Sequence, residues 1–114
     1  MLHKVVVATD DQRIMRAVES FGGNCVLTRT SHQSGTDRLA EAAEILGLSD
    51  EDLIVNIQGD EPLLDPSMID ELIRAALASG FEMATLAFPG SDAEAFFDPN
   101  CVKVVTDRRG KAIY

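Results

Sequence analysis

Residues 4–28 have the sequence KVVVATDDQRIMRAVESFGGNCVLT, which predicts a strand, a helix and a second strand in succession. The first six residues form a β-branched run of strand length. Either residue of the Asp10-Asp11 pair can then cap a helix, which the Gly22-Gly23 pair ends. The last four residues supply the second strand. One apolar helix face is expected, made of Ile14, Val18 and Phe21.

The alternation of helices and strands continues along the chain. Ser34 and Asp37 have the spacing of a capping box, and the helix that they open stops at Gly47. Its buried face is expected to contain Leu39, Ala43 and Leu46. Residues 53–57 (LIVNI) are nearly all apolar, which favours a strand covered on both faces.

A third helix is predicted to begin at Asp65-Pro66 and to end at Gly80. Its apolar stripe comprises Ile69, Leu72, Ile73 and Ala76. Two more strands are expected at residues 83–88 and 102–105, with a short acidic segment between them at 91–97. Lys111 to Tyr114 have the pattern of a further strand that has just begun.

Strands that alternate with helices favour β-α-β units and a mainly parallel sheet. We therefore predict one α/β domain over residues 1–114, with three layers (α/β/α). The chain opens and ends on strands of the buried type, which require neighbours to pair with and cover them. We expect the sheet to be incomplete, as in an internal piece of a longer chain. Exposed sheet edges would then favour self-association.

The composition is that of an ordinary globular protein, with 46% hydrophobic and 25% charged residues. A net charge of -9 argues against binding to nucleic acids or to anionic membranes. Cys25 and Cys101 lie among apolar neighbours and lack metal-ligand spacing, so both are expected to be buried thiols. With neither a signal peptide nor a membrane-length apolar run, the sequence favours the cytoplasm.

Three polar clusters follow the first three predicted strands, and in parallel sheets ligands bind at this edge. They are Thr9 to Asp11, Arg29 to Arg38, and Gln58 to Glu61. Arg29 and Arg38 are the only arginines or lysines between Ala17 and Ile73, which suits an acidic protein that binds an anion.

The helix N-terminus at Ser34, Gly35 and Thr36 adds outward-facing N–H groups. In the third cluster, the Asp60 carboxylate can bind Mg²⁺, which usually shares its oxygen ligands with substrate phosphates.

Each cluster also has a purely structural interpretation, which the residues alone leave open. The first can be a helix cap, the arginines of the second can form surface ion pairs, and Asp60 can belong to a solvated acidic turn. His32 is more simply a solvated loop histidine than a general base, because nothing near it in the sequence marks a nucleophile.

Five ordered stretches resemble the CMP-Kdo synthetases, also called 3-deoxy-manno-octulosonate cytidylyltransferases. They are VVVATDD, TRTSHQSGTDRLAEA, IVNIQGDEPLL, MATLAFP and PNCVKVVTDRRGKAIY, and together they run from Val5 to Tyr114. The resemblance implies a Rossmann-like nucleotidyltransferase fold. It also implies transfer of CMP from CTP to the sugar acid Kdo with Mg²⁺, release of pyrophosphate, a role in lipopolysaccharide synthesis, and a homodimer.

The resemblance also implies roles for individual residues. Asp60 matches the metal-binding, catalytic carboxylate, and Gln58 a contact to the nucleotide or the sugar. Arg29 and Ser34 match residues that contact the cytosine. We place Gly35 and Thr36 with them in the nucleotide loop and assign Arg38 to the anionic substrate.

Parts of the family pattern are missing from this sequence. No glycine-rich loop with a lysine precedes Lys4 to hold the triphosphate, and the family's second metal-binding aspartate has no counterpart. We therefore expect little catalysis by this chain alone. Three alternatives stay open: a nucleotidyltransferase for another sugar, a non-catalytic folded remnant, and a receiver-like Mg²⁺-binding signalling domain. In the last case Lys103, placed inside a predicted strand, is in the wrong position.

Overall fold

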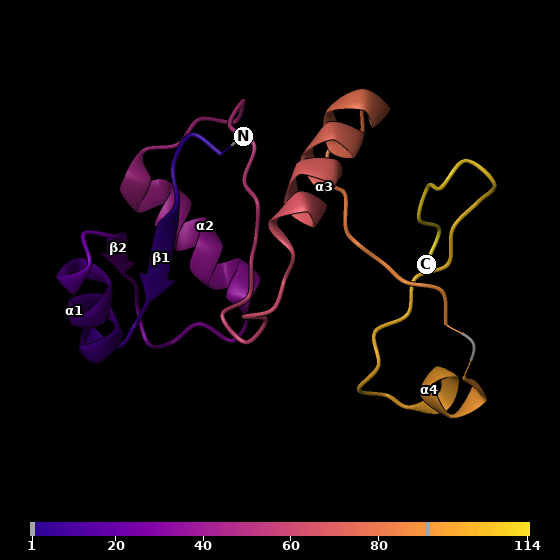
Figure 1. Cartoon of the computed structure of the whole chain (residues 1–114), viewed down its shortest axis with the longest axis horizontal. Helices are drawn as coiled ribbons and strands as arrows, with labels where there is room; N and C mark the ends of the chain where they lie inside the picture. The colour runs from indigo at the N-terminus through magenta and orange to yellow at the C-terminus, as the bar shows by residue number, and fades with distance from the viewer. Residues whose placement is uncertain (1, 91) are drawn as a thin grey trace. The chain divides into compact units, whose positions relative to one another are not determined.

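A computed structural model describes residues 2–90 and 92–114 of the chain (Figure 1). Their order is β1 (Val6–Thr9), α1 (Gln12–Ser20), β2 (Asn24–Leu27), α2 (Gly35–Leu46), α3 (Pro66–Ser79) and α4 (Ala93–Phe97). The chain divides into two compact units, Met1–Asp70 and Glu71–Tyr114, and the boundary falls within α3. That residues 1–114 form one domain stays a prediction.

The first unit is built on the predicted β-α-β unit. β1 and β2 pair in parallel, with Val6 opposite Asn24 and Thr9 opposite Leu27. Asp11 caps α1 by accepting a hydrogen bond from the Arg13 backbone N–H. Helices α1 and α2 both contact the two strands, and they lie on opposite sides of the pair (Figure 1). This is the α/β/α layering that the sequence predicts.

The predicted apolar face of α1 is only partly confirmed. Val18 is buried, but Ile14 and Phe21 are 48% and 74% exposed. Two strands form a narrow surface, and of these three side chains only Val18 is buried against it. The helix ends as predicted at the glycine pair, where Gly22 has a φ of 79° that favours glycine.

Helix α2 confirms the predicted capping box and its glycine stop. The Ser34 hydroxyl oxygen accepts from the Asp37 backbone N–H, and Gly47 has a left-handed φ of 65°. Ala42 is its buried residue, whereas the predicted Leu39, Ala43 and Leu46 are half-buried. The most buried position of this helix therefore lies beside the predicted residues and is not one of them.

The predicted strands at 53–57, 83–88 and 102–105 are wrong as regular strands. Within residues 2–90 and 92–114, the structure has a ladder of several residues only between β1 and β2. A strand needs a neighbour to complete its backbone hydrogen bonds, and an apolar composition alone does not supply one. Residues 53–57 consequently run as extended, mostly exposed chain.

Helix α3 begins at Pro66 as predicted, and Gly80, with a φ of 68°, follows its last residue. Ile73 is its buried residue, and the rest of the predicted stripe is half-buried. None of the helices in the described parts of the chain is long and apolar enough to cross a membrane.

The second unit contains the short helix α4 inside the acidic segment, where the sequence pattern predicted no helix. Ser91 of that segment lies outside the described residues. The Asp92 side chain caps α4. The end of the chain folds back as a hairpin, where Val105 exchanges backbone hydrogen bonds with Ile113 and Tyr114. The start of a strand predicted at 111–114 therefore pairs locally.

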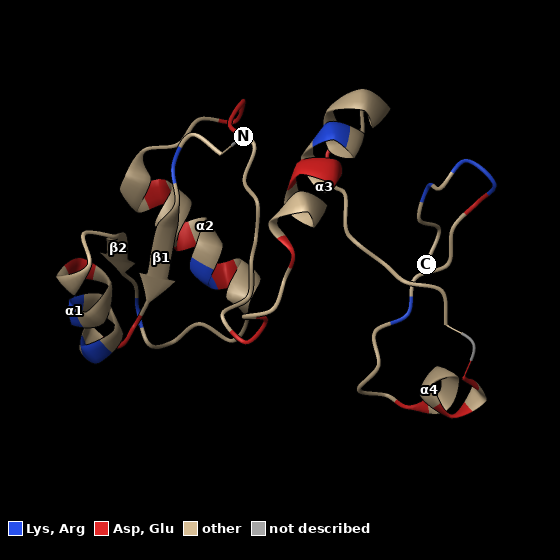
Figure 2. Ribbon diagram, in the orientation of Figure 1, with Lys and Arg blue, Asp and Glu red and all other residues tan. Residues whose placement is uncertain are grey.

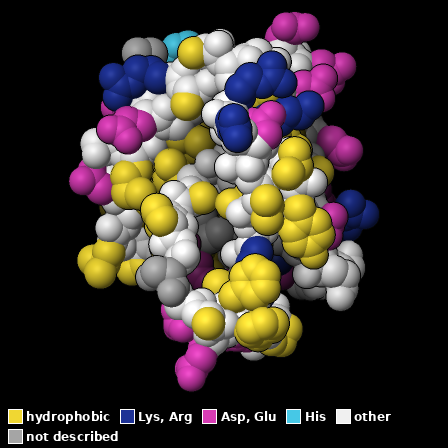
Figure 3. Space-filling view, turned by 90° about the vertical axis from the view of Figure 1, so that its right-hand side faces the viewer, with side chains coloured by type: hydrophobic (Ala, Val, Ile, Leu, Met, Phe, Trp, Pro, Cys, Tyr) yellow, Lys and Arg dark blue, Asp and Glu magenta, His cyan; other side chains and the backbone are white. Residues whose placement is uncertain are grey.

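Apolar side chains are prominent on the surface of the second unit (Figure 3). Met83, Phe88, Phe97 and Val102 are each between 81% and 96% exposed. The apolar side chains that led to the strand predictions are present here, but the described residues of this unit form no layer that covers them.

Candidate functional site

Arg38, from the first turn of α2, joins the carboxyl ends of β1 and β2. Its guanidinium donates to Asp10 Oδ2 at 2.9 Å and to Thr28 Oγ1 at 2.6 Å. Thr9 and Thr28 are buried here, and the Thr28 N–H donates to the Thr9 carbonyl at 2.8 Å. The first two predicted polar clusters therefore meet, as expected for the edge of a parallel sheet. Arg38 already has protein partners, and its role with substrate stays a prediction.

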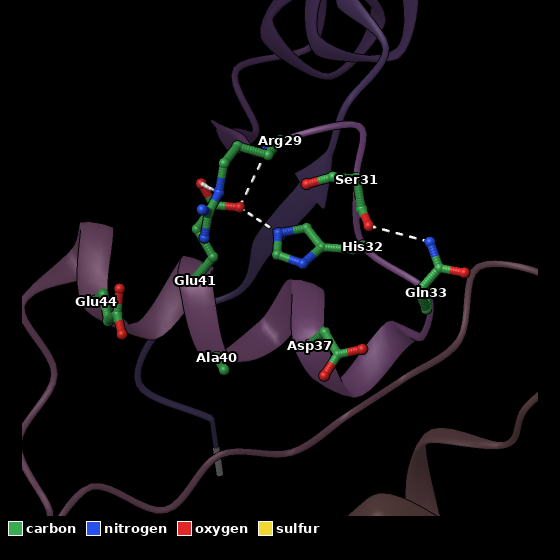
Figure 4. A pocket seen from close by; sticks show the side chains of 8 residues that line it. All are labelled: Arg29, Ser31, His32, Gln33, Asp37, Ala40, Glu41 and Glu44. Atoms are coloured by element: carbon green, nitrogen blue, oxygen red, sulfur yellow. Dashed lines mark hydrogen bonds and ion pairs between the residues drawn. The ribbon is translucent and has the colours of Figure 1, made fainter.

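Glu41, one turn further along α2, lies between Arg29 and His32 (Figure 4). Its carboxylate accepts from the Arg29 backbone N–H at 3.0 Å and from Arg29 Nε at 3.2 Å. It also contacts His32 Nε2. Figure 4 shows the side chains of Arg29 and His32 converging on it from the loop that follows β2. Glu41 was not among the residues predicted from the sequence, although its position three residues after Arg38 places both on one helix face.

The interpretation of His32 as a solvated histidine is wrong. Its side chain is only 10% exposed, and that of Glu41 is 15% exposed. The ring is buried because it packs toward α2 instead of projecting from the loop (Figure 4). Arg29 keeps a 70% exposed side chain, so its guanidinium can still reach a ligand.

The hydrogen bond from His32 is the largest cause that lowers the pKa of Glu41 below its ordinary value, and the backbone N–H of Arg29 adds to it. Glu41 is therefore an ionised carboxylate at neutral pH. A carboxylate only accepts hydrogen bonds, so His32 Nε2 must carry the proton that it donates.

These residues line an open hollow of about 340 Å³ on the α2 side of the loop. The lining comprises Arg29, Ser31, His32, Gln33, Asp37, Ala40, Glu41 and Glu44. Both signs of charge face the hollow, and Figure 2 shows acidic residues on all four helices of the described chain. The hollow therefore offers both donors and acceptors in an otherwise acidic protein.

Gln58, from the third predicted cluster, lies against the start of α2. A Cβ added to Gly35 would be 2.9 Å from Gln58 Nε2 and 3.1 Å from Oε1. Gly35 does not have a left-handed φ, so the backbone conformation does not require glycine here. Its lack of a side chain instead lets Gln58 approach the backbone closely. The loop of the second cluster and the turn of the third therefore share one surface, next to Ser34 and Thr36.

Asp60 lies in the turn that follows Gln58 and is exposed to solvent. With its neighbours it borders a second hollow of about 420 Å³, lined also by Glu61, Pro62, Leu63, Leu64 and Met68. The described residues contain no group of three or more histidine, cysteine or acidic side chains that could hold a metal. An exposed single carboxylate nevertheless fits Mg²⁺, which often takes one or two carboxylates and completes its shell with water and substrate phosphates.

A family model described as cytidylyltransferase matches residues 1–114. The chain belongs to the cytidylyltransferase family. It is 55% identical over 112 residues to the 3-deoxy-manno-octulosonate cytidylyltransferase of Pseudomonas fluorescens, which covers 96% of this chain and 44% of that protein. It is 53% identical over 114 residues to the enzyme of the same name from Syntrophobacter fumaroxidans, covering 99% of this chain and 46% of the relative.

A solved structure of CMP:2-keto-3-deoxy-manno-octonic acid synthetase, complexed with CTP, superposes with a TM-score of 0.79. It is 38% identical, and the match covers 99% of this chain and 46% of that one. The predicted α/β fold of the Rossmann-like nucleotidyltransferase type is therefore confirmed, as is the predicted family. This cytidylyltransferase chain spans less than half the length of the relatives it matches. The receiver-like alternative receives no support.

Proposed function

We propose that this chain is part of an enzyme that transfers CMP from CTP to the sugar acid Kdo and supplies CMP-Kdo for lipopolysaccharide synthesis. Relatives named for this activity share about half of its residues, and the similar solved structure holds CTP. The observation that carries the proposal is the close approach of the Gln58 side chain to Gly35, because it brings the two most specific motifs of the sequence onto one surface.

The proposed reaction is an in-line displacement at the α-phosphorus of CTP. The anomeric hydroxyl oxygen of the sugar acid forms a new P–O bond, the bond between the α- and β-phosphates breaks, pyrophosphate leaves, and the hydroxyl proton passes to solvent or to a basic group. Such a transfer depends mainly on positioning and on neutralising phosphate charge.

The residues of this candidate site divide these tasks. Arg29 and the capped start of α2 at Ser34, Gly35 and Thr36 present donors to the nucleotide. Gln58 lies beside them, where its amide can contact the nucleotide or the sugar. Arg38 holds the two strand ends and adds positive charge for the anionic substrates.

Asp60 would hold Mg²⁺, which would neutralise phosphate charge when bound. Its exposed carboxylate is suited to this role because, within residues 2–90 and 92–114, no hydrogen bond or ion pair engages it. The cytoplasm as the site of action is supported by two free cysteines, which are typical of a reducing compartment. A homodimer, or self-association through strand edges, remains part of the proposal.

The test is ligand-detected NMR of the 114-residue chain with CTP and Mg²⁺. ATP serves as the nucleobase control. Asp60→Asn is compared with Asp50→Asn, an exposed acidic residue outside both hollows. We expect CTP to bind in preference to ATP, and Asp60→Asn to weaken binding by about fivefold or more because charge-assisted contacts exceed neutral ones. Equal binding of both nucleotides, or equal loss in the two variants, would contradict the proposal.

A further inference from the structure

The peptide groups on both sides of Arg29 are held by two side chains of α2. Its N–H donates to Glu41 Oε2 at 3.0 Å, and its carbonyl accepts from Arg38 Nη1 at 3.5 Å. Residues three apart on a helix lie on one face, so Arg38 and Glu41 both hydrogen-bond the loop from a single turn of α2. The loop conformation is therefore set by the helix and not by the loop sequence alone.

Glu41 makes the shorter of these two backbone contacts. Three donors converge on its two oxygens: the Arg29 N–H, Arg29 Nε and His32 Nε2. The His32 and Glu41 side chains are 10% and 15% exposed, so water competes little for these contacts. A glutamine of equal size would place an NH₂ group against at least one of the donors.

We propose that Glu41 is the positioning residue of the nucleotide loop: by holding the Arg29 backbone and guanidinium together with the His32 ring, it sets the arrangement that receives the nucleobase. This inference rests on the proposed function of the site. Glu41 lines the hollow, but its side chain is only 15% exposed, so its effect on a ligand passes through Arg29, whose side chain is 70% exposed.

A simpler role for Glu41 would be general stabilisation of the fold. The two roles differ in what they predict for a variant that still folds. If Glu41 only stabilises, loss of its contacts lowers the melting temperature and leaves nucleotide affinity unchanged at temperatures where the chain is folded. If it positions the loop, affinity falls while the β1–β2 pairing is intact.

The experiment compares Glu41→Gln with Glu51→Gln, an exposed glutamate outside the hollow. Without ligand, NMR follows hydrogen exchange of the Arg29 amide and the nitrogen shifts of the His32 ring, and the amides of β1 and β2 report on the fold. CTP is then titrated into each chain. Glu41→Asp, which keeps the charge but shortens the reach, is the second variant if Glu41→Gln does not fold.

For Glu41→Gln we expect Arg29 amide exchange to accelerate by about tenfold or more, and the nitrogen shifts of the His32 ring to change because Nε2 loses its carboxylate acceptor. CTP affinity should fall by about five- to thirtyfold, with Glu41→Asp between it and the parent chain. Glu51→Gln should match the parent.

Unchanged Arg29 and His32 signals in Glu41→Gln would overturn the proposal, and so would a released loop with unchanged CTP affinity. Failure of the parent chain to bind CTP would count against the proposed function instead. In that case the ligand-free spectra would still decide whether Glu41 positions the loop.

Discussion

Replacing Gly35 by alanine should separate fold stability from nucleotide binding. The added Cβ would lie 2.9 Å from Gln58 Nε2, closer than non-bonded atoms tolerate. The obstructing atoms are the end of a flexible side chain, so the Gln58 amide should swing away while the backbone stays in place. The first turn of α2 has no left-handed residue that alanine would strain.

We expect Gly35→Ala to raise the stability of the fold and to lower the affinity for CTP. Alanine in place of glycine at a compatible position stabilises by about 0.4–1 kcal/mol, which raises the melting temperature by roughly 2–6 °C in a chain of this size. Loss of one neutral hydrogen bond from Gln58 to a ligand costs about 0.5–1.5 kcal/mol, or roughly two- to twelvefold in affinity.

The assay pairs a thermal melt with a CTP titration. Gly90→Ala is the matched control, because its added Cβ would meet nothing within 4 Å and its φ is not left-handed. In the double variant of Gly35→Ala with Gln58→Ala, the two losses of affinity should not add, since both remove the same contact. A lower melting temperature for Gly35→Ala, or fully additive losses, would refute the reasoning.

Three further predictions concern the fold and its titrating groups. Ser34→Ala should destabilise the chain by about 1 kcal/mol in urea unfolding, because the first turn of α2 loses its cap. The pKa of Glu41 is lowered from 4.5 by its hydrogen bonds, so its contribution to stability is present above that pH and is lost as the pH falls through the folded value. The difference in stability between the parent chain and Glu41→Gln should therefore shrink in acid, as the pH falls through the lowered pKa of Glu41. Burial raises the pKa of the Cys25 thiol, so at pH 8 iodoacetamide should alkylate it more slowly than a free cysteine.

Local signals in the sequence predicted the elements that depend on neighbouring residues. Asp11 caps α1 by accepting from an N–H two residues on, and Ser34 caps α2 by accepting from one three residues on. Gly47, after α2, and Gly80, after α3, adopt the left-handed conformation at a helix end. Such contacts form within one or two turns and require nothing from distant parts of the chain. Their outcome is decided by residue type and spacing, which the sequence shows directly.

Strand prediction failed where pairing was required. Residues 53–57 are as apolar as a buried strand, yet apolar character shows only that a segment suits a covered position. Whether a strand forms depends on a partner at the right register, which a periodic pattern does not identify. β1 and β2 succeed because α1 returns the chain directly alongside, in the parallel arrangement that β-α-β units produce.

The same distinction explains which part of the candidate site the sequence could describe. The motif around Ser34 predicted a capped helix and a cation-bearing loop, and both are present. Its internal organisation was hidden, because Glu41 looks like an ordinary helix glutamate until the fold places Arg29 and His32 against it.

Arg38 and Glu41 connect the loop to the sheet through one helix. Arg38 ties α2 to the ends of β1 and β2, and Glu41 holds the loop from the next turn of the same helix. The loop that follows β2 is thus fixed by a helix that is itself fixed to the sheet. Asp60 has no such chain of contacts among the described residues and reaches the site through the adjacent Gln58 turn. CTP binding through the loop should therefore be less sensitive to changes in that turn than the metal binding proposed for Asp60, and the paired Asp60→Asn and Glu41→Gln titrations measure the two separately.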